Sequence, residues 1–161
     1  MVCIKDPNNP SREELVAFFN SEEVQRGVLD FAHKSSREAG MEVSFEGVYK
    51  QGFLTNPRLM NLMPFVIAQT TESRDLNSEG FLEGVIFEFM KYALIRNGQI
   101  DTKRISFIKQ YEPNPIVPVN PNPIFYEGSS DADGVYRGTW RFSSDVGDLA
   151  RQGSFELIKI E

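Results

Sequence analysis

Side chains that could carry catalysis are scarce in this sequence. It contains one histidine, His33, and one cysteine, Cys3. A Ser-His-Asp arrangement requires a histidine beside its nucleophile, and a zinc site built from His and Cys requires several such ligands. His33 falls within a predicted helix, and Cys3 lies near the chain terminus. We therefore expect no catalysis of these kinds, no metal site and no cofactor.

Carboxylates are the remaining acid–base candidates. Glu83 and Glu88 flank an apolar segment, and burial of either side chain would raise its pKa and suit it to a general base. Asp131 and Asp133, in the sequence DADG, are typical of a turn and lack the further ligands of a calcium loop. The pattern leaves a metal-free isomerase or lyase open as a less favoured alternative, and it assigns no catalytic residue.

Aromatic residues are the stronger candidates for a binding function. Tyr49, Phe107, Tyr136 and Trp140 share the inward parity of predicted strands, so they line whatever the strands enclose. An eight-stranded barrel is either filled by side chains or holds one small ligand. These four rings therefore either pack the core or bind a small apolar or aromatic ligand, with phenol and indole groups as donors.

Alternation of apolar and polar residues predicts strands through residues 41–161. In MEVSFEGVYK, residues 41–50, and in GVYRGTWRF, residues 134–142, aromatic side chains share one face and charged ones the other. Glycines inside the strands allow tight curvature. The same alternation recurs in residues 104–111, 123–128 and 153–161. Short curved strands with glycine-rich turns predict a mainly β protein with an antiparallel barrel.

Two consecutive helices are expected before the barrel, over residues 11–39. Ser11 followed by Glu14 forms a capping box, and Gly40 is a C-terminal stop. Apolar residues recur at helical spacing on both sides of an interruption at Ser21. The apolar stripes of both helices must therefore pack against the rest of the chain.

Two segments are harder to interpret. Residues 78–96 fit either a helix or strands. Strands are favoured because the glycines in this segment weaken a helix and because Asn97-Gly98 is a two-residue hairpin signal. Five prolines in residues 113–123 exclude a helix and a central strand, and they predict an extended loop.

A series of glycine and aromatic motifs runs through the predicted strands. In chain order these are Gly80-Phe81 with Gly84, then Ile105, Phe107, Lys109 and Tyr111, then Tyr126 with Gly128, then Gly134, Tyr136, Gly138 and Trp140, and finally Gly153, Phe155 and Leu157. Together they resemble the calycin-like barrels, which include lipocalins, avidins and fatty-acid-binding proteins. The resemblance covers residues 41–161 and implies a meandering barrel whose first and last strands are adjacent. It also implies ligand binding, and it carries over no catalytic residue.

Length, composition and charge limit the class of protein. A chain of 161 residues suits one domain, here residues 1–161, with residues 11–39 helical and residues 41–161 forming the barrel. The net charge of −6 argues against nucleic acid and anionic membranes as partners. The opening MVCIKDPNNP lacks the apolar core of a secretory signal, and no apolar run is long enough to cross a bilayer. We therefore expect a cytoplasmic location.

Two functional hypotheses follow. The first is a small soluble barrel that binds an apolar or aromatic ligand inside. The alternative is a protein-interaction or assembly module that uses the proline-rich loop 113–123, because extended proline segments dock readily on aromatic grooves or on another subunit. A homo-oligomer is left open.

Overall fold

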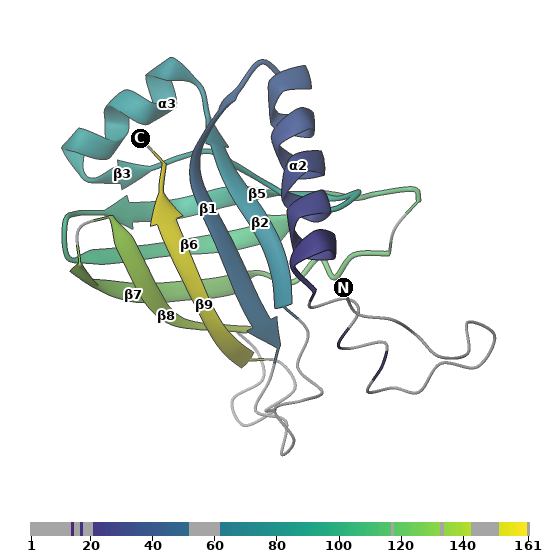
Figure 1. The fold of residues 1–161 in the computed structure, drawn as a ribbon. Coiled ribbons are helices and arrows are strands. Elements are labelled where there is room, and N and C mark those ends of the chain that lie inside the picture. The colour runs from purple at the N-terminus through teal and green to yellow at the C-terminus, as the bar shows by residue number, and fades with distance from the viewer. Residues whose placement is uncertain are drawn as a thin grey trace.

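The computed structural model of this chain describes residues 14, 17, 21–51, 62–116, 118–132, 134–142 and 152–160. In this part of the chain, nine antiparallel strands form one sheet, and eight of them close a barrel (Figure 1). The strands are β1 (Glu42–Gln51), β2 (Leu62–Gln69), β3 (Phe81–Leu82), β4 (Val85–Phe87), β5 (Tyr92–Ile100), β6 (Arg104–Tyr111), β7 (Ile124–Ala132), β8 (Val135–Phe142) and β9 (Gln152–Lys159). The predicted mainly β, antiparallel barrel is confirmed.

Strand pairing shows how the barrel closes. Around the ring the order is β4, β2, β1, β9, β8, β7, β6 and β5, and β5 pairs again with β4. The first and last strands, β1 and β9, are neighbours from Phe45 opposite Lys159 to Gln51 opposite Gly153. This adjacency is the one that the resemblance to calycin-like barrels implied.

Inward-facing side chains fill the barrel. β6 shows the alternation clearly, because Ile105, Phe107, Lys109 and Tyr111 are buried and the residues between them are less so. Most of the large residues in the core cluster are aromatic. Its buried residues are Phe45, Phe65, Ile67, Leu82, Ile86, Ala93, Ile105, Phe107, Tyr111, Ile124, Tyr126, Tyr136, Trp140, Phe155 and Leu157.

One N-terminal helix is described, α2 (Glu22–Glu38), where the sequence predicts two. Ser21 begins it, since the Ser21 hydroxyl accepts a hydrogen bond from Val24 N at 3.4 Å. Gly40 follows its last turn with φ +74°, which confirms the predicted stop. α2 lies on the outside of the barrel against β1 and β2 (Figure 1).

The expected first helix falls on residues 11–20. Of these only Glu14 and Ala17 are described, and both are helical. Ser11 and the capping box that it was expected to form lie outside the described residues. The prediction of two N-terminal helices is therefore not confirmed.

Two short helices follow β2, and the sequence patterns did not predict them. α3 (Thr71–Asp75) begins at Thr70, whose hydroxyl accepts from Ser73 N at 3.1 Å, and η2 (Leu76–Glu79) is a 3-10 turn. In Figure 1 they lie beside the C-terminal end of β9. They border one end of the barrel.

Residues 78–96 form strands rather than a long helix. They contain the end of η2, then β3 and β4, and the start of β5. Gly84 explains part of this result, because a Cβ at this position would lie 2.6 Å from the carbonyl oxygen of Ala68. The strand alternative is confirmed, and the helix alternative is wrong.

The Asn97-Gly98 pair does not form the expected hairpin. Both residues lie inside β5, where the register with β6 shifts between Arg96 and Gln99. Asn97 has φ +50°, and a Cβ on Gly98 would collide with the carbonyl group of Leu82. These residues therefore form a bulge that lets β5 pair closely with β3.

The reversal between β5 and β6 falls at residues 101–103 instead. Asp101 Oδ1 accepts hydrogen bonds from Lys103 N at 2.7 Å and from Arg104 N at 2.8 Å. Asp101 therefore makes the turn that the sequence analysis expected at Asn97-Gly98, because its side chain bonds the backbone amides that follow it.

The proline-rich loop lies against the barrel. Its described residues form no helix or strand, as predicted. Asn114 Nδ2 donates to Met90 O at 2.7 Å, and Gln110 Nε2 donates to Pro121 O at 3.3 Å. Val119 packs against the core cluster. The loop therefore joins the β4–β5 turn to the end of β6.

Close strand contact at Gly138 gives a test of the curvature argument. Gly138 on β8 faces Gly128 on β7, and a Cβ at Gly138 would collide with the backbone of Glu127. We expect Gly138→Ala to lower the free energy of unfolding by about 1–3 kcal/mol, measured by urea denaturation. Thr139→Ala, at an exposed position of the same strand, should change it by less than about 0.5 kcal/mol. Equal effects of the two substitutions would contradict the argument.

Candidate functional site

The four predicted ligand-binding residues all lie in the barrel interior. Phe107, Tyr136 and Trp140 are buried, and Tyr49 is partly buried against the core cluster. Tyr49 and Trp140 meet edge to face, with ring centroids 6.0 Å apart. Phe107 stacks on Tyr126 with centroids 4.8 Å apart and planes inclined by 9°. The predicted inward parity is therefore confirmed for all four.

Their polar groups bond to the protein itself. Trp140 Nε1 donates to Lys50 O at 3.0 Å, and Tyr136 Oη donates to Asp101 O at 2.6 Å. Tyr49 Oη donates to Glu88 Oε1 at 2.8 Å. Because the donors expected to orient a ligand have these partners, the contacts favour the core-packing alternative. Ligand binding by the four rings stays a prediction.

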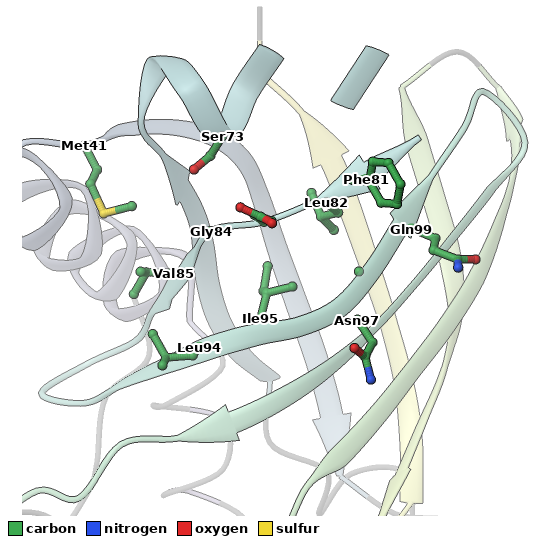
Figure 2. Close-up of a pocket in the computed structure, with 12 residues that line it drawn as sticks. Met41, Ser73, Phe81, Leu82, Gly84, Val85, Leu94, Ile95, Asn97 and Gln99 are labelled. Atoms are coloured by element: carbon green, nitrogen blue, oxygen red, sulfur yellow. The ribbon is translucent and has the colours of Figure 1, made fainter. Parts of the chain in front are cut away.

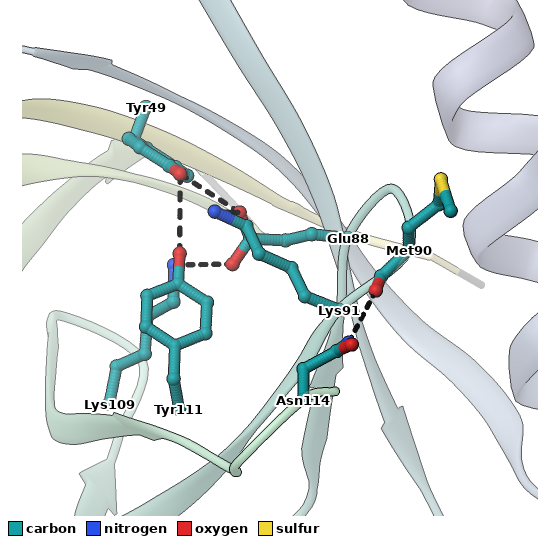
Figure 3. Close-up of polar contacts among 7 residues, drawn as sticks. All are labelled: Tyr49, Glu88, Met90, Lys91, Lys109, Tyr111 and Asn114. Atoms are coloured by element: carbon teal, nitrogen blue, oxygen red, sulfur yellow. Dashed lines mark hydrogen bonds and ion pairs between the residues drawn. The ribbon is translucent and has the colours of Figure 1, made fainter. Parts of the chain in front are cut away.

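A cluster of charged and phenolic groups lies at one end of the barrel (Figure 3). Glu88 follows β4 and points inward, and its Oε2 lies 2.6 Å from Lys109 Nζ. Both side chains are only 1% exposed. Lys91 Nζ lies 3.9 Å from Glu88 Oε1, and the Tyr49 and Tyr111 hydroxyls are 3.3 Å apart. The barrel thus buries an ion pair among tyrosines.

Aromatic rings surround the Lys109 ammonium group. Its Nζ lies 4.4 Å from the centroid of Tyr49 and 4.5 Å from that of Tyr111. The rings of Phe65 and Tyr126 lie further away, at 5.9 Å and 5.7 Å. Cation–π attraction is strongest for a desolvated cation, so these faces offset part of the cost of burying Lys109.

Electrostatics decides what Glu88 can do. Burial alone would raise the pKa of Glu88, but the ammonium groups of Lys109 and Lys91 outweigh burial and lower it. The expected raised pKa is therefore wrong for Glu88, and Glu83 is exposed on the surface. A carboxylate that is held charged by two cations is a weak proton acceptor. This geometry favours a structural ion pair over a general base.

The partners of Glu88 are shifted as well. Burial lowers the pKa of Lys109, although the Glu88 carboxylate opposes this effect. Burial and the charge of Glu88 together raise the pKa of Tyr49 and of Tyr111. The phenols therefore stay protonated and serve as hydrogen-bond donors. The sequence motifs included Lys109 between Phe107 and Tyr111, but they gave it no role in a site, although its inward parity was a signal.

A hollow opens at the opposite end of the barrel. We call it the mouth hollow; its volume is about 820 Å³. It lies where β1 begins and β5 and β9 end, next to α3 and η2. Its lining residues are Ser44, Phe45, Arg74, Asn77, Ser78, Glu79, Gly80, Ile100, Asp101, Thr102, Tyr136, Lys159 and Ile160. Of the four predicted ligand-binding residues, Tyr136 lines the mouth hollow.

Ser44 is the unusual residue of the mouth hollow. The side chain is 6% exposed, and its Oγ has no hydrogen-bond partner within the described part of the chain. A buried hydroxyl without a partner costs free energy, so such a group needs an explanation. No sequence signal pointed to Ser44, because its parity in β1 places it on the outer face.

The charged residues around the mouth hollow differ in whether other groups of the protein already bind them. Arg74 Nη2 lies 3.0 Å from Glu42 Oε2. Hydrogen bonds from the backbone amides of Lys103 and Arg104 lower the pKa of Asp101, which therefore serves the β5–β6 turn. Lys159 forms no ion pair with any residue that the structure describes. Of the two basic residues in the lining, Arg74 and Lys159, Lys159 is therefore the one without a carboxylate partner among the described residues.

A second hollow lies on the outer side of the sheet (Figure 2). Its volume is about 650 Å³, and Phe81 and Leu82 of β3 face Val85 of β4 and Leu94 and Ile95 of β5 across it. Among the residues described, none of its lining side chains carries a buried polar atom without a partner. The mouth hollow is therefore the better candidate for a ligand site.

Comparisons with known proteins add no family. No protein-family model matches the chain, and neither the curated proteins nor the solved structures compared with it give a match. What the fold establishes is the class, a closed eight-stranded antiparallel β-barrel with one described N-terminal helix. Within the described ranges, no helix combines the length and apolar character that a membrane span requires.

Removing Lys109 tests the buried ion pair. We expect Lys109→Met to lower the free energy of unfolding by about 3–5 kcal/mol, because it leaves Glu88 charged and buried with the more distant Lys91 as its only cation. The double variant Glu88→Leu with Lys109→Met should recover much of this loss, since an apolar pair of similar volume needs no charge partner. Chemical denaturation of the two single variants and the double variant measures the coupling. A double variant that loses the sum of both single effects would contradict the pairing.

The lowered pKa of Glu88 predicts a loss of stability in acid. A carboxyl group whose pKa is lower in the folded state stabilises that state above its unfolded pKa, near 4.5. This contribution disappears as the pH falls through the folded pKa. Wild-type stability should therefore decrease below about pH 4.5 more steeply than that of Glu88→Gln. Urea midpoints measured from neutral pH downward check this, and parallel curves would disprove it.

Proposed function

We propose that the protein binds one small amphipathic molecule in the mouth hollow. The observation that carries the proposal is the buried Ser44 hydroxyl, which lacks a partner among the described residues while lining a hollow of about 820 Å³. Binding sites for small molecules typically measure about 300–1,000 Å³ and combine apolar walls with a few polar groups. A ligand oxygen or nitrogen at Ser44 would supply the missing hydrogen bond.

The lining suggests what kind of molecule fits. Ile100 and Tyr136 offer an apolar wall, and Phe45 is fully buried beneath it. Ser44 offers a hydroxyl, Lys159 adds a positive charge at the rim, and Glu79 and Asp101 add negative charges. An apolar or aromatic body with one acceptor group, neutral or anionic, matches this distribution. This ligand class is the one expected from the sequence, although it lies at the mouth instead of between the four predicted rings.

We infer further that the chain is related to calycin-like barrels. Support comes from the closed eight-stranded antiparallel barrel and from the pairing of β1 with β9. The glycine and aromatic motifs lie in strands β3 to β9 and in the turns beside them. Relationship to this class would make ligand binding the default function. The cytoplasmic location stays a prediction.

Fewer observations support the two alternatives, an isomerase or lyase and an interaction module, than support ligand binding. Tyr49 and Glu88, which an isomerase or lyase would use inside the barrel, bond each other, and Glu88 has a lowered pKa. In the proline-rich loop, Asn114 and Gln110 hold the described residues against the barrel. An interaction role for this loop stays a prediction.

Binding of 8-anilinonaphthalene-1-sulfonate, an apolar aromatic anion, tests the proposal. We expect saturable fluorescence enhancement with one site per chain. Ser44→Ala should weaken binding about fivefold, because one hydrogen bond contributes about 1 kcal/mol. Thr102→Trp places a bulky ring at the exposed rim of the mouth hollow and should abolish binding, whereas Thr139→Trp on the outer surface of β8 should not. Equal binding by both tryptophan variants would exclude the mouth hollow as the site.

A further inference from the structure

Exposed apolar side chains gather where α2 meets the β4–β5 turn. Phe31 of α2 is 39% exposed, and Phe89 and Met90 of the turn are 50% and 41% exposed. The rings of Phe31 and Phe89 lie 4.9 Å apart, so the two elements form one surface. Figure 3 shows the Met90 side chain pointing away from the polar cluster, on the side of a helix. A contiguous apolar surface of this kind marks an interaction site.

Ile116 extends this surface. It is 75% exposed, and it lies in the proline-rich loop two residues after Asn114, which donates to Met90 O. Ile116 N in turn donates to Asn114 Oδ1 at 2.8 Å, so the backbone around this side chain is held in place. The exposed isoleucine is therefore presented beside the β4–β5 turn by an anchored loop.

Gly27 lies one turn before Phe31 on the same side of α2. Glycine in the middle of a helix is unfavourable, so its presence calls for a reason. A Cβ at Gly27 would meet no atom within 4 Å in the described part of the chain, so contacts with the described residues do not require glycine. Gly27 leaves a notch in the helix surface next to the exposed ring of Phe31. A ring or a helix from another molecule can approach this notch closely.

We propose that α2 packs antiparallel against α2 of a second copy, with Phe31 of each copy seated over Gly27 of the other. Such an interface is two-fold symmetric, because each contact from one copy to the other is repeated in reverse. The two-fold axis passes between the two helices, at a level midway between Gly27 and Phe31. Phe89 and Met90 extend the apolar contact at both sides of the helix pair.

Charges along α2 favour this partner and this direction. The helix begins with the exposed Glu22 and Glu23 and carries the exposed Lys34 and Arg37 near its end. Lys34 Nζ lies 3.9 Å from Glu38 Oε1 within the helix, an exposed pair that contributes little. With Phe31 over Gly27, an antiparallel pair places Glu23 beside Lys34 of the other copy. A parallel pair would place like charges together. The face therefore carries its own complement in shape and in charge, which selects a second copy over an unrelated protein.

Sedimentation velocity of the full chain over a concentration series tests the proposal. We expect a shift from monomer to dimer with rising concentration. Phe31→Ser and Gly27→Glu should each remove the dimer, since one deletes the ring and the other fills the notch. Phe81→Ser is the matched control, because Phe81 is 55% exposed on β3 and lies outside the proposed interface. It should leave the monomer–dimer equilibrium unchanged.

Charge reversal tests the register. Glu23→Lys alone and Lys34→Glu alone each create two repulsive pairs per dimer and should weaken association by about tenfold or more. The double variant Glu23→Lys with Lys34→Glu restores opposite charges and should return to wild-type association. All of these positions are exposed, so unchanged thermal unfolding of each variant verifies that folding is intact.

Three results would overturn the proposal. The first is a wild-type chain that sediments as a monomer at every concentration, and the second is a dimer that persists in both Phe31→Ser and Gly27→Glu. The third is a double charge reversal that associates no better than the single reversals; the partner of this face would then be a different surface or a different protein. None of these outcomes bears on the mouth hollow, which the dye titration tests separately.

Discussion

Closure of the sheet is the constraint on which the rest of the structure depends. The ring is completed where β5 pairs with the three-residue β4 on one side and with β6 on the other. β5 also bends at Asn97 and Gly98, where only a residue without a side chain can pass the carbonyl group of Leu82 in β3, the strand outside the ring. Gly128 and Gly138 allow the same close contact between β7 and β8. Because the ring closes, every inward side chain of the eight strands belongs to one shared interior.

The two ends of this interior have different chemistry. At one end the β4–β5 turn brings Glu88 and Lys91 over Lys109, and the tyrosine hydroxyls complete a closed polar cluster. Buried ion pairs seldom stabilise a protein more than an apolar pair would, so their better-attested use is to specify one arrangement. Here the pair fixes how a short strand and its turn meet the end of β6. At the other end no such cluster closes the barrel, and the mouth hollow retains the Ser44 hydroxyl.

Local sequence patterns predicted the strands well because each strand is amphipathic on its own. The alternation in β1, β6 and β8 follows directly from having one face in the core, and it placed Tyr49, Phe107, Tyr136 and Trp140 correctly inside. Asn97-Gly98 misled because a positive φ serves a bulge as well as a hairpin, and only the neighbouring Leu82 distinguishes the two. α3 is too short to show a periodic apolar stripe.

The candidate site was harder to predict because it depends on contacts between distant segments. Lys109 had the parity of a core residue, but its partner Glu88 comes from a segment whose secondary structure the sequence left open. The lowered pKa of Glu88 required knowing that two lysines converge on it. Alternation predicted Ser44 on the outward face of β1, but the register of β1 with β2 shifts between Val43 and Phe45, and Ser44 is buried.

The proposed ligand site and the proposed dimer surface use separate parts of the molecule. Gly27 lies in the N-terminal half of α2, near the helix end where Gln25 donates to Leu62 O at the start of β2. The other end of α2 leads through Gly40 into β1, whose first residues border the mouth hollow. Pairing of two copies through Gly27 and Phe31 covers the exposed rings beside the closed end of the barrel. Because it does not involve residues that line the mouth hollow, both copies retain an open mouth, and a dimer would bind two ligands.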